Sequence, residues 1–386
     1  MQVKELKSAM LMAAGAVAAT GSHSALAQEQ VVKIGLVAPV TGPIAHWGKD
    51  NVNGARMAID ELNAKSIVIG GRKTKFELLA EDDASDPKQA TAAAQKLADA
   101  KVHGVIGHVT SGTTIPASRI YADSGIPQIS PSATNPKYTQ QGFKTAFRVV
   151  ANDSQLGGTL GRYAVQTAQA KSIAVIDDRT AYGQGVADEF IKGARSRNPN
   201  INIVARQYTH DKATDFNAIL TAIKAKNPDV VFFGGMDAVG GPMLRQMKAL
   251  GINAKFMGGD GVCSESLGAL AGDALTDNSV VCAEAGGVED NQKKGLDEFK
   301  TAYKKKFDME LQIYAPYVYD SVMLMVAAMH KANSSEPQKY LPELAKIQYK
   351  GVTGNIAFDN RGDVKDGMLT LYTYKGGKRS MITVTH

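Results

Sequence analysis

The feature that most constrains the fold is an alternation of short, β-rich apolar runs with amphipathic stretches, which begins at Val31 and continues almost to the end of the chain. Several runs, such as GVIGHV, SIAVIDD and DVVFFGGM, are nearly continuous in apolar residues, as strands buried on both faces should be. The stretch 48–65 instead repeats Ala55, Ile59 and Leu62 at helical spacing. The alternation therefore predicts an α/β fold with parallel sheets and helices on both sides.

The length of the chain predicts two domains. A single hydrophobic core usually stops growing at about 250–300 residues, and this chain has 386. No Pro-, Ser- or Gly-rich linker separates two halves, so we expect the chain to cross between two lobes more than once and form a hinge. Candidate crossings lie near 148–152, 280–284 and 356–360. The segment 368–386 alternates like a hairpin, with KGGK as its turn.

The first 27 residues have the pattern of a secretory signal peptide. Lys4 and Lys7 form a basic start, an apolar stretch runs from Ala9 to Ala19, and small residues precede a cleavage point after Ala27. The apolar stretch is too short to span a bilayer. The alternative is an amphipathic helix belonging to the folded domain. The cleavage point has no Cys for a lipid anchor, so we expect an exported, soluble, periplasmic protein.

The charge distribution argues against nucleic acid as a partner. The formal net charge is +6, but the basic residues are scattered along the chain. The run Lys304–Lys306 falls on a solvated helical pattern, and no basic stripe interleaved with aromatic residues occurs.

The two cysteines, Cys263 and Cys282, do not have the spacing of zinc ligands, and no histidine lies close to them in sequence. In an oxidising compartment we expect them to form a disulfide. The alternative is two separately buried thiols.

No arrangement typical of catalysis occurs. The segment 42–50 is one residue too long for a phosphate-binding loop and carries Asp50 where that loop needs Ser or Thr. Neither a G-x-S-x-G elbow nor an H-E-x-x-H helix is present. His108 ends a strand as either a wall residue or a base, and the acidic pairs 82–83 and 177–178 are either turn and cap residues or metal ligands. We predict no enzyme activity, no cofactor and no metal site.

Polar strand ends favour ligand recognition instead, because open α/β sheets bind ligands beyond the carboxyl ends of their strands. Thr110 and Ser111 lie where a strand passes into a helix, whose free N–H groups favour a carboxylate. Ser132 and Thr134 offer backbone and hydroxyl groups, and Asp260 could bind an ammonium from the other lobe. The alternative for each hydroxyl cluster is simple helix capping.

These segments, taken in order, resemble the periplasmic branched-chain amino-acid-binding proteins of ABC importers, the leucine/isoleucine/valine-binding type. The likeness covers nearly the whole mature chain and is carried by KIGLVAPVTGPIAHWGKD, EDDASDPKQA, VIGHVTSGTTIPAS, ISPSATNPKYT, DDRTAYGQGVADEF, FMGGDGV and YAPYVYDSV. The resemblance implies two Rossmann-like lobes joined by a three-segment hinge, which close around one amino acid without catalysis. The implied lobes are 28–149 with 283–357, and 150–282 with 358–386.

The resemblance also implies a binding site. Ser111 matches the serine that holds the α-carboxylate, and Ser132 and Thr134 match residues that hold the ligand carboxylate and ammonium. Tyr182 matches a tyrosine of the second lobe that closes over the ligand. Asp260 stands where the leucine-type proteins have a glutamate that binds the ammonium.

Aromatic matches and departures from the family pattern complete this set. Trp47 and Tyr317 match aromatic residues near the cleft, with plain packing as the alternative. Met236 replaces a frequent tyrosine, and Ser85 and Thr110 stand where the leucine-type proteins have a disulfide. The full implied ligand-binding set is Trp47, Thr110, Ser111, Ser132, Ala133, Thr134, Tyr182, Met236, Asp260 and Tyr317.

The implied partners are a small amino acid, with leucine, isoleucine, valine or a related molecule expected, and the membrane permease of an ABC transporter. We expect a monomer. The alternative is a periplasmic sensor that reports an amino acid or a small amide to a membrane receptor, because the same fold serves both roles.

Overall fold

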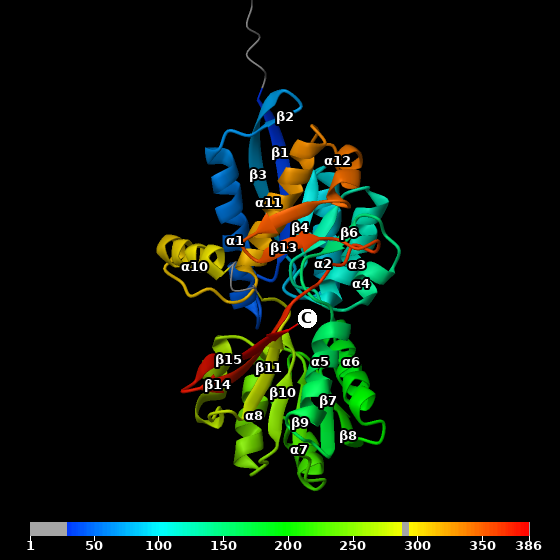
Figure 1. The fold of residues 1–386 in the computed structure, drawn as a ribbon, viewed down its shortest axis with the longest axis vertical. Helices are drawn as coiled ribbons and strands as arrows, with labels where there is room; N and C mark the ends of the chain where they lie inside the picture. The colour runs from blue at the N-terminus through cyan, green and yellow to red at the C-terminus, as the bar shows by residue number, and fades with distance from the viewer. Residues whose placement is uncertain (1–28, 288–292, 386) are drawn as a thin grey trace, which may run out of the picture.

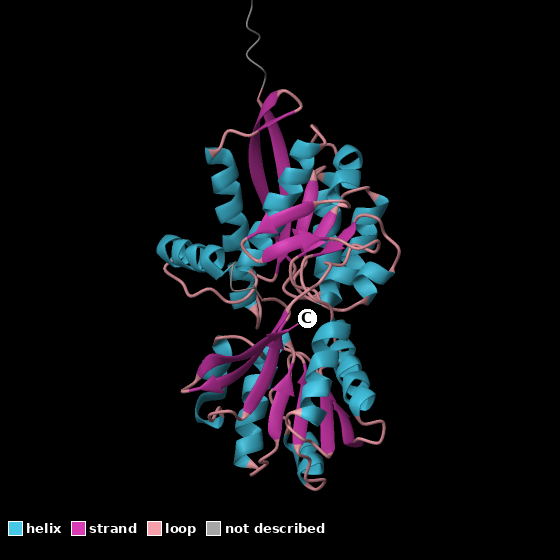
Figure 2. Ribbon diagram, in the orientation of Figure 1, coloured by secondary structure: helices cyan, strands magenta, loops and turns pink. Residues whose placement is uncertain are grey.

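The computed structural model of the protein describes residues 29–287 and 293–385 and contains two α/β lobes stacked end to end (Figure 1). Each lobe is built on one sheet flanked by helices (Figure 2), and we call them lobe 1 and lobe 2 in chain order. The predicted signal peptide lies outside the described residues. Within these two ranges, no helix combines the length and the apolar character needed to cross a membrane.

The sheet of lobe 1 is parallel except at one edge, where β2 pairs with β3 in an antiparallel hairpin. In spatial order its strands are β2 (Val68–Ile69), β3 (Arg72–Asp82), β1 (Gln30–Ala38), β4 (Gly104–Gly107), β5 (Gln128–Ser130) and β6 (Ala146–Arg148). The helices of this lobe are α1 (Ala45–Ala64), α2 (Pro87–Asp99), α3 (Ser111–Asp123), α4 (Lys137–Gln140), α10 (Lys293–Phe307), α11 (Ala315–Lys331) and α12 (Pro337–Leu344). A small antiparallel ribbon, β12 (Gln348–Gly351) and β13 (Gly354–Ala357), completes it.

The sheet of lobe 2 is parallel at its centre and antiparallel at one edge. In spatial order its strands are β15 (Lys378–Thr385), β14 (Leu369–Lys375), β11 (Val280–Glu284), β10 (Lys255–Gly258), β9 (Val230–Gly234), β7 (Ser172–Asp177) and β8 (Asn202–Tyr208). Its helices are α5 (Asp153–Gln166), α6 (Ala181–Arg197), α7 (Asn217–Lys224), α8 (Asp237–Ala249), α9 (Ser266–Ala271) and the 3₁₀ turns η1 (Asp260–Val262) and η2 (Gly272–Ala274). The predicted α/β fold class is confirmed.

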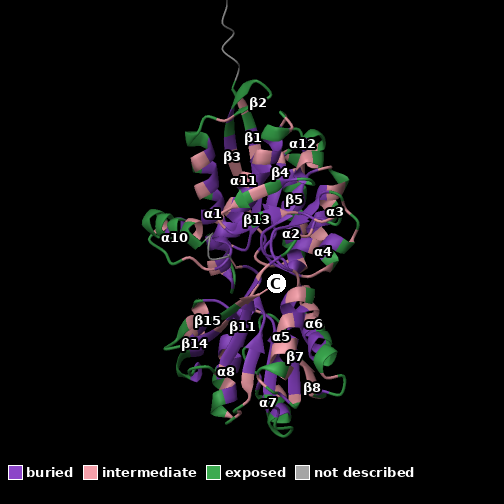
Figure 3. Cartoon of the chain, viewed as in Figure 1, coloured by how far each residue is buried: buried purple, intermediate pink, exposed green. Residues whose placement is uncertain are grey.

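The burial of the central strands explains their continuous apolar runs. Every residue of β4 and β9 is buried, because helices cover both faces of each sheet (Figure 3). In lobe 2, Phe232 of β9 stacks on Phe190 of α6 with ring centroids 4.0 Å apart. The predicted C-terminal hairpin is present as β14 and β15, and Gly376 and Gly377 at its turn both have positive φ, which glycine adopts at little cost.

Within the described residues, the chain leaves one sheet for the other after β6, after β11 and before β14. The pairing of individual residues differs from the expected lobe boundaries at two points. Ala283 and Glu284 still pair with β14, so the second passage begins after Glu284 rather than at 283. Asp363 forms a bridge with Arg148 at the end of β6, so the segment from 358 to 363 stays with lobe 1 rather than opening lobe 2.

Arg148 fixes the loop that carries several predicted binding residues. Its buried guanidinium donates to the carbonyl oxygens of Ala133 and Asn135, at 3.0 and 2.9 Å, and pairs with the Asp363 carboxylate. A buried charge needs partners of this kind to offset its lost hydration. The loop after β5 is therefore held against the third passage between the lobes.

Cys263 and Cys282 form a disulfide in the structure. The bond joins the end of η1 to β11, and it closes a loop that begins just after Asp260. A disulfide across a loop of this size restricts the unfolded chain and contributes about 3 kcal/mol in the chain-entropy model.

Candidate functional site

The carboxyl ends of the parallel strands of both sheets meet at the junction between the lobes (Figure 1). A small cavity of about 10 Å³ lies there, because side chains from both lobes meet across it. Its lining consists of Ile44, Trp47, Val109, Thr110, Ser111, Ser132, Ala133, Tyr182, Met236, Asp260, Gly261 and Tyr314. Eight of the residues predicted from the sequence thus lie around one space.

Lobe 1 contributes hydroxyl groups and the start of a helix. Thr110 precedes α3 in an extended conformation, and Ser111 is the first helical residue, so the unpaired N–H groups of a helix N-terminus lie at this wall. The Ser111 hydroxyl accepts from the backbone N–H of Asn135 at 3.2 Å, and the Ser132 hydroxyl donates to the Val109 carbonyl at 2.8 Å. These bonds hold the loops after β4 and β5 side by side.

Thr134 follows the residues of this wall but does not line the cavity. Its hydroxyl is buried and has no hydrogen-bond partner among the described residues. Burial of an unpaired hydroxyl is costly. Burial raises the pKa of the Asp153 carboxyl, and the Thr134 side chain opposes that rise.

Lobe 2 contributes one carboxylate, that of Asp260 at the start of η1. Asp260 Oδ1 accepts from the Tyr182 hydroxyl at 2.7 Å and from the Gly261 N–H at 3.1 Å. Asp260 Oδ2 accepts from the hydroxyl of Tyr314, a residue of lobe 1. Burial raises the pKa of Asp260 to about 6, while the two tyrosine hydroxyls act in the opposite direction by stabilising its charge.

Tyr314 belongs to the site although the sequence analysis did not select it. Its backbone N–H donates to Asp50 at 3.1 Å, and the N–H of Ala315 donates to the same carboxylate at 2.8 Å, so Asp50 fixes the start of α11. The Tyr314 ring packs on Trp47 with centroids 5.3 Å apart. The available signal was an aromatic residue just before Pro316, at a helix start, within the YAPY motif.

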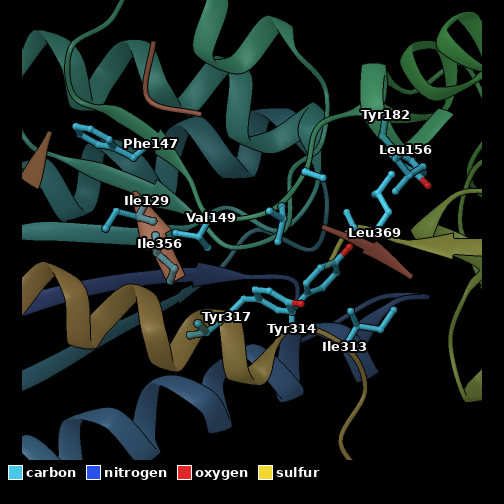
Figure 4. Packing of buried hydrophobic residues seen from close by; sticks show 14 of the residues in the cluster. Ile129, Phe147, Val149, Leu156, Tyr182, Ile313, Tyr314, Tyr317, Ile356 and Leu369 are labelled. Atoms are coloured by element: carbon cyan, nitrogen blue, oxygen red, sulfur yellow. The ribbon is translucent and has the colours of Figure 1, made fainter. Parts of the chain in front are cut away.

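Tyr317, predicted to lie near the cleft, does not line the cavity. It lies three residues further along α11, so its hydroxyl reaches the second passage and accepts from the Gly287 N–H at 3.1 Å. Figure 4 shows the two tyrosines side by side, with Tyr314 extending toward Tyr182 and Leu369 of lobe 2. Tyr317 therefore contributes to the hinge rather than to the wall of the cavity.

The remaining sequence candidates have structural partners. His108 is buried and bonds Asp83 at 2.9 Å and Tyr121 at 3.1 Å, as a wall residue would. Asp82 and Asp178 accept from backbone N–H groups of the turns that follow them. No group of His, Cys, Asp and Glu with the composition of a metal site occurs within 29–287 and 293–385.

A second, larger cavity of about 480 Å³ adjoins the first. Ile44, Thr110, Tyr182 and Met236 line both cavities and separate them. Ser85 also lines the larger one, and its hydroxyl lies 3.4 Å from that of Thr110. Three of the four positions expected to depart from the leucine-type pattern, Ser85, Thr110 and Met236, thus line one space.

Comparison with known proteins confirms the resemblance. Residues 31–378 match the family model described as periplasmic binding protein. A leucine-, isoleucine-, valine-, threonine- and alanine-binding protein of Pseudomonas aeruginosa is 35% identical over 364 residues, covering 94% of this chain and 95% of that protein. The leucine-specific-binding protein of Salmonella typhimurium is 36% identical over 362 residues, covering 93% and 94%.

Solved structures agree with the sequence relatives. A leucine binding protein, LivK, from Thermotoga maritima has a TM-score of 0.83 at 26% identity and covers 92% of this chain and 98% of its own. The branched-chain amino acid transporter substrate binding protein LivJ from Streptococcus pneumoniae, in complex with isoleucine, has a TM-score of 0.82 at 27% identity and covers 92% and 99%.

The contacts of Asp260 lead to a prediction about its titration. Tyr314→Phe removes a hydroxyl that stabilises the charged form of Asp260, so the pKa of Asp260 should rise above its value of about 6. The measurement is an NMR titration of the carboxyl carbon resonances. Tyr317→Phe is the matched control and should leave the pKa of Asp260 unchanged; equal effects of the two substitutions would refute the assigned contact.

Proposed function

We propose, since this chain belongs to the periplasmic binding protein family, that it is an extracytoplasmic solute-binding protein that captures a small amino acid between its lobes and delivers it to an ABC transporter permease. A branched-chain or other aliphatic amino acid is the ligand that the site favours. The observation that carries the proposal is one cavity lined by hydroxyl groups and the start of a helix from lobe 1 and by a buried carboxylate from lobe 2.

The charge pattern of the two walls is complementary to a zwitterion. In lobe 1, the first N–H groups of α3 and the Ser111 hydroxyl suit an α-carboxylate. In lobe 2, Asp260 suits an α-ammonium in a charge-assisted bond. Closure removes both charges from water, so each must find its partner on the opposing walls. Ser132 and Ala133 add further backbone and hydroxyl groups to the cavity lining, and we propose that Thr134 joins them when a ligand is bound.

The rest of the cavity lining is apolar. A cavity of about 10 Å³ has room for roughly one water molecule, so the lobes must move apart to admit a ligand, and these apolar side chains then suit an aliphatic side chain. Ile44, Trp47 and Val109 come from lobe 1, and Met236 comes from lobe 2. Burying a side chain of this kind contributes about 1.5–3 kcal/mol. The names of the relatives point the same way, since one is a leucine-, isoleucine-, valine-, threonine- and alanine-binding protein and the other is a leucine-specific-binding protein.

The role in transport follows from the family. We propose that the protein is exported to the periplasm as a monomer, that it catalyses no reaction, and that its closed form is what the permease recognises. The output of binding is then a change in the relative position of the lobes rather than a chemical product.

The proposal is tested by a thermal-shift screen of the standard amino acids and small amides. A ligand at 100 times its Kd stabilises the folded state by about 2.7 kcal/mol, so its Tm should rise clearly. Asp260→Ala should weaken binding of the same ligand by at least about 2 kcal/mol, or about 30-fold in Kd, because the ammonium is left unpaired in a closed cleft. Absence of any shift in the wild type, or near-normal affinity in the variant, would sink the proposal.

Binding should depend on pH through Asp260. Burial raises its pKa to about 6, so the carboxyl is neutral below that pH. The ligand ammonium needs the ionised form, and binding must then release a proton. Affinity should therefore fall as the pH falls below about 6, by up to about tenfold per pH unit, and stay level above about pH 7. Calorimetry across this range measures the slope, which Asp260→Asn should abolish; a slope that survives in this variant belongs to another group.

Met236 should determine how large a side chain the site accepts. It separates the smaller cavity from the larger one, and its flexible thioether can adapt to different ligands. Met236→Tyr puts a stiff ring there, so affinity for phenylalanine and methionine should fall by roughly tenfold more than affinity for valine. Met236→Leu conserves the volume and is the control. Calorimetry with the three amino acids measures the ratios, and a uniform loss for all three would contradict this role.

A further inference from the structure

We propose that Asp237 is a positioning residue of the binding site: from lobe 2 it holds Trp47 and His46 of lobe 1, orienting the indole that lines the cavity and tying the closed lobes together. The inference deepens the proposed function and rests on it in one respect, namely that Trp47 contacts the ligand. Asp237 itself does not line the cavity and acts through Trp47.

The Asp237 carboxylate is buried and accepts from both lobes. It begins α8, directly after Met236. From lobe 1, His46 Nε2 donates to Oδ2 at 2.9 Å and Trp47 Nε1 donates to the same oxygen at 3.4 Å. From lobe 2, the Ser264 hydroxyl donates to Oδ2, and the N–H of Ala238 donates to Oδ1 at 2.8 Å. The residues that meet here lie 191 and 190 positions apart in sequence.

The number of hydrogen bonds that the Asp237 carboxylate accepts therefore depends on the relative position of the lobes. When the lobes separate, Asp237 keeps Ser264 and Ala238 but loses both donors from α1, and water must replace them. When the lobes close, the same carboxylate is out of water and depends on His46 and Trp47 for half of its hydrogen bonds. Asp237 therefore stabilises the closed arrangement when α1 packs against α8, because only then do His46 and Trp47 donate to its carboxylate.

The same contacts set the orientation of the indole. One edge of Trp47 is held at Asp237, and its ring packs on Tyr314, whose hydroxyl bonds Asp260. Two hydrogen bonds thus join the lobes at this point. Trp47 of lobe 1 donates to Asp237 of lobe 2, and Tyr314 of lobe 1 donates to Asp260 of lobe 2. Loss of the Asp237 carboxylate would remove the hydrogen bond that holds the Trp47 indole N–H to lobe 2.

The competing explanation is that Asp237 only stabilises lobe 2, through Ser264 and the first turn of α8. The chain offers variants that separate the two roles. His46→Ala removes a donor from lobe 1 and leaves Asp237 and all of lobe 2 intact. Ser264→Ala removes a donor within lobe 2 and leaves the contacts between lobes in place.

Trp47 is the sole tryptophan of the chain, so its fluorescence reports the contact directly. With L-leucine bound, and in the same direction without it, Asp237→Ala and His46→Ala should each shift the emission to longer wavelength and increase quenching by acrylamide, while Ser264→Ala should match the wild type. Asp237→Asn, which keeps one acceptor oxygen, should lie between. If Asp237→Ala fails to fold by circular dichroism, His46→Ala and Asp237→Asn carry the test. Emission and quenching unchanged from wild type in these variants would overturn the proposal.

The second arm measures release of L-leucine by stopped-flow fluorescence. Asp237→Ala should speed dissociation roughly tenfold, with less effect on association, because the closed form loses its tie. His46→Ala should act in the same direction, and the two effects should not add in the double variant. If the effects of the two substitutions on the dissociation rate add fully, or if neither changes that rate, the hydrogen bond between His46 and Asp237 does not hold the lobes together. If the wild type binds neither L-leucine nor another amino acid, the proposed function fails, while the ligand-free quenching results still decide whether Asp237 holds Trp47.

Discussion

The need of a buried carboxylate for hydrogen-bond donors is the constraint on which the site depends. Asp260 lies out of water and takes its side-chain donors from both lobes, Tyr182 from lobe 2 and Tyr314 from lobe 1. Its raised pKa reflects the cost of that burial. Because one donor comes from each lobe, the relative position of the lobes and the state of this charge are coupled. In the proposed function, a ligand ammonium would compete with the tyrosine hydroxyls for the same oxygens.

Other buried charges place the site residues by the same physics. Asp50 receives the N–H groups of Tyr314 and Ala315 and so fixes the start of α11. The Arg148 guanidinium donates to two backbone carbonyl oxygens of the loop after β5 and pairs with Asp363 from the third passage. Each of these charges would be costly if left alone, so each specifies one arrangement of the backbone around it. The binding groups are therefore positioned by polar contacts from segments far apart in the chain.

The fold itself could be predicted from local patterns. Alternating apolar runs and helical stretches specify the parallel sheets, because strands covered on both faces must be apolar throughout. The start of α3 at Ser111 and the turn at Gly376 follow from short-range rules. The exact ends of the passages between lobes could not be predicted from local patterns, because Ala283 and Asp363 pair with residues distant in sequence.

The sequence by itself determined which chemical groups stand at the strand ends, since Ser111, Ser132 and Asp260 are local features of strand-to-helix turns. Only the tertiary structure decided which of the aromatic residues of the YAPY motif reaches the cavity, because Asp50 sets the start of α11 and thereby directs Tyr314 to Asp260 and Tyr317 to the hinge. It also decided the meeting of His46 with Asp237. Contacts between lobes depend on how two separately folded sheets pack, and no short-range pattern carries that information.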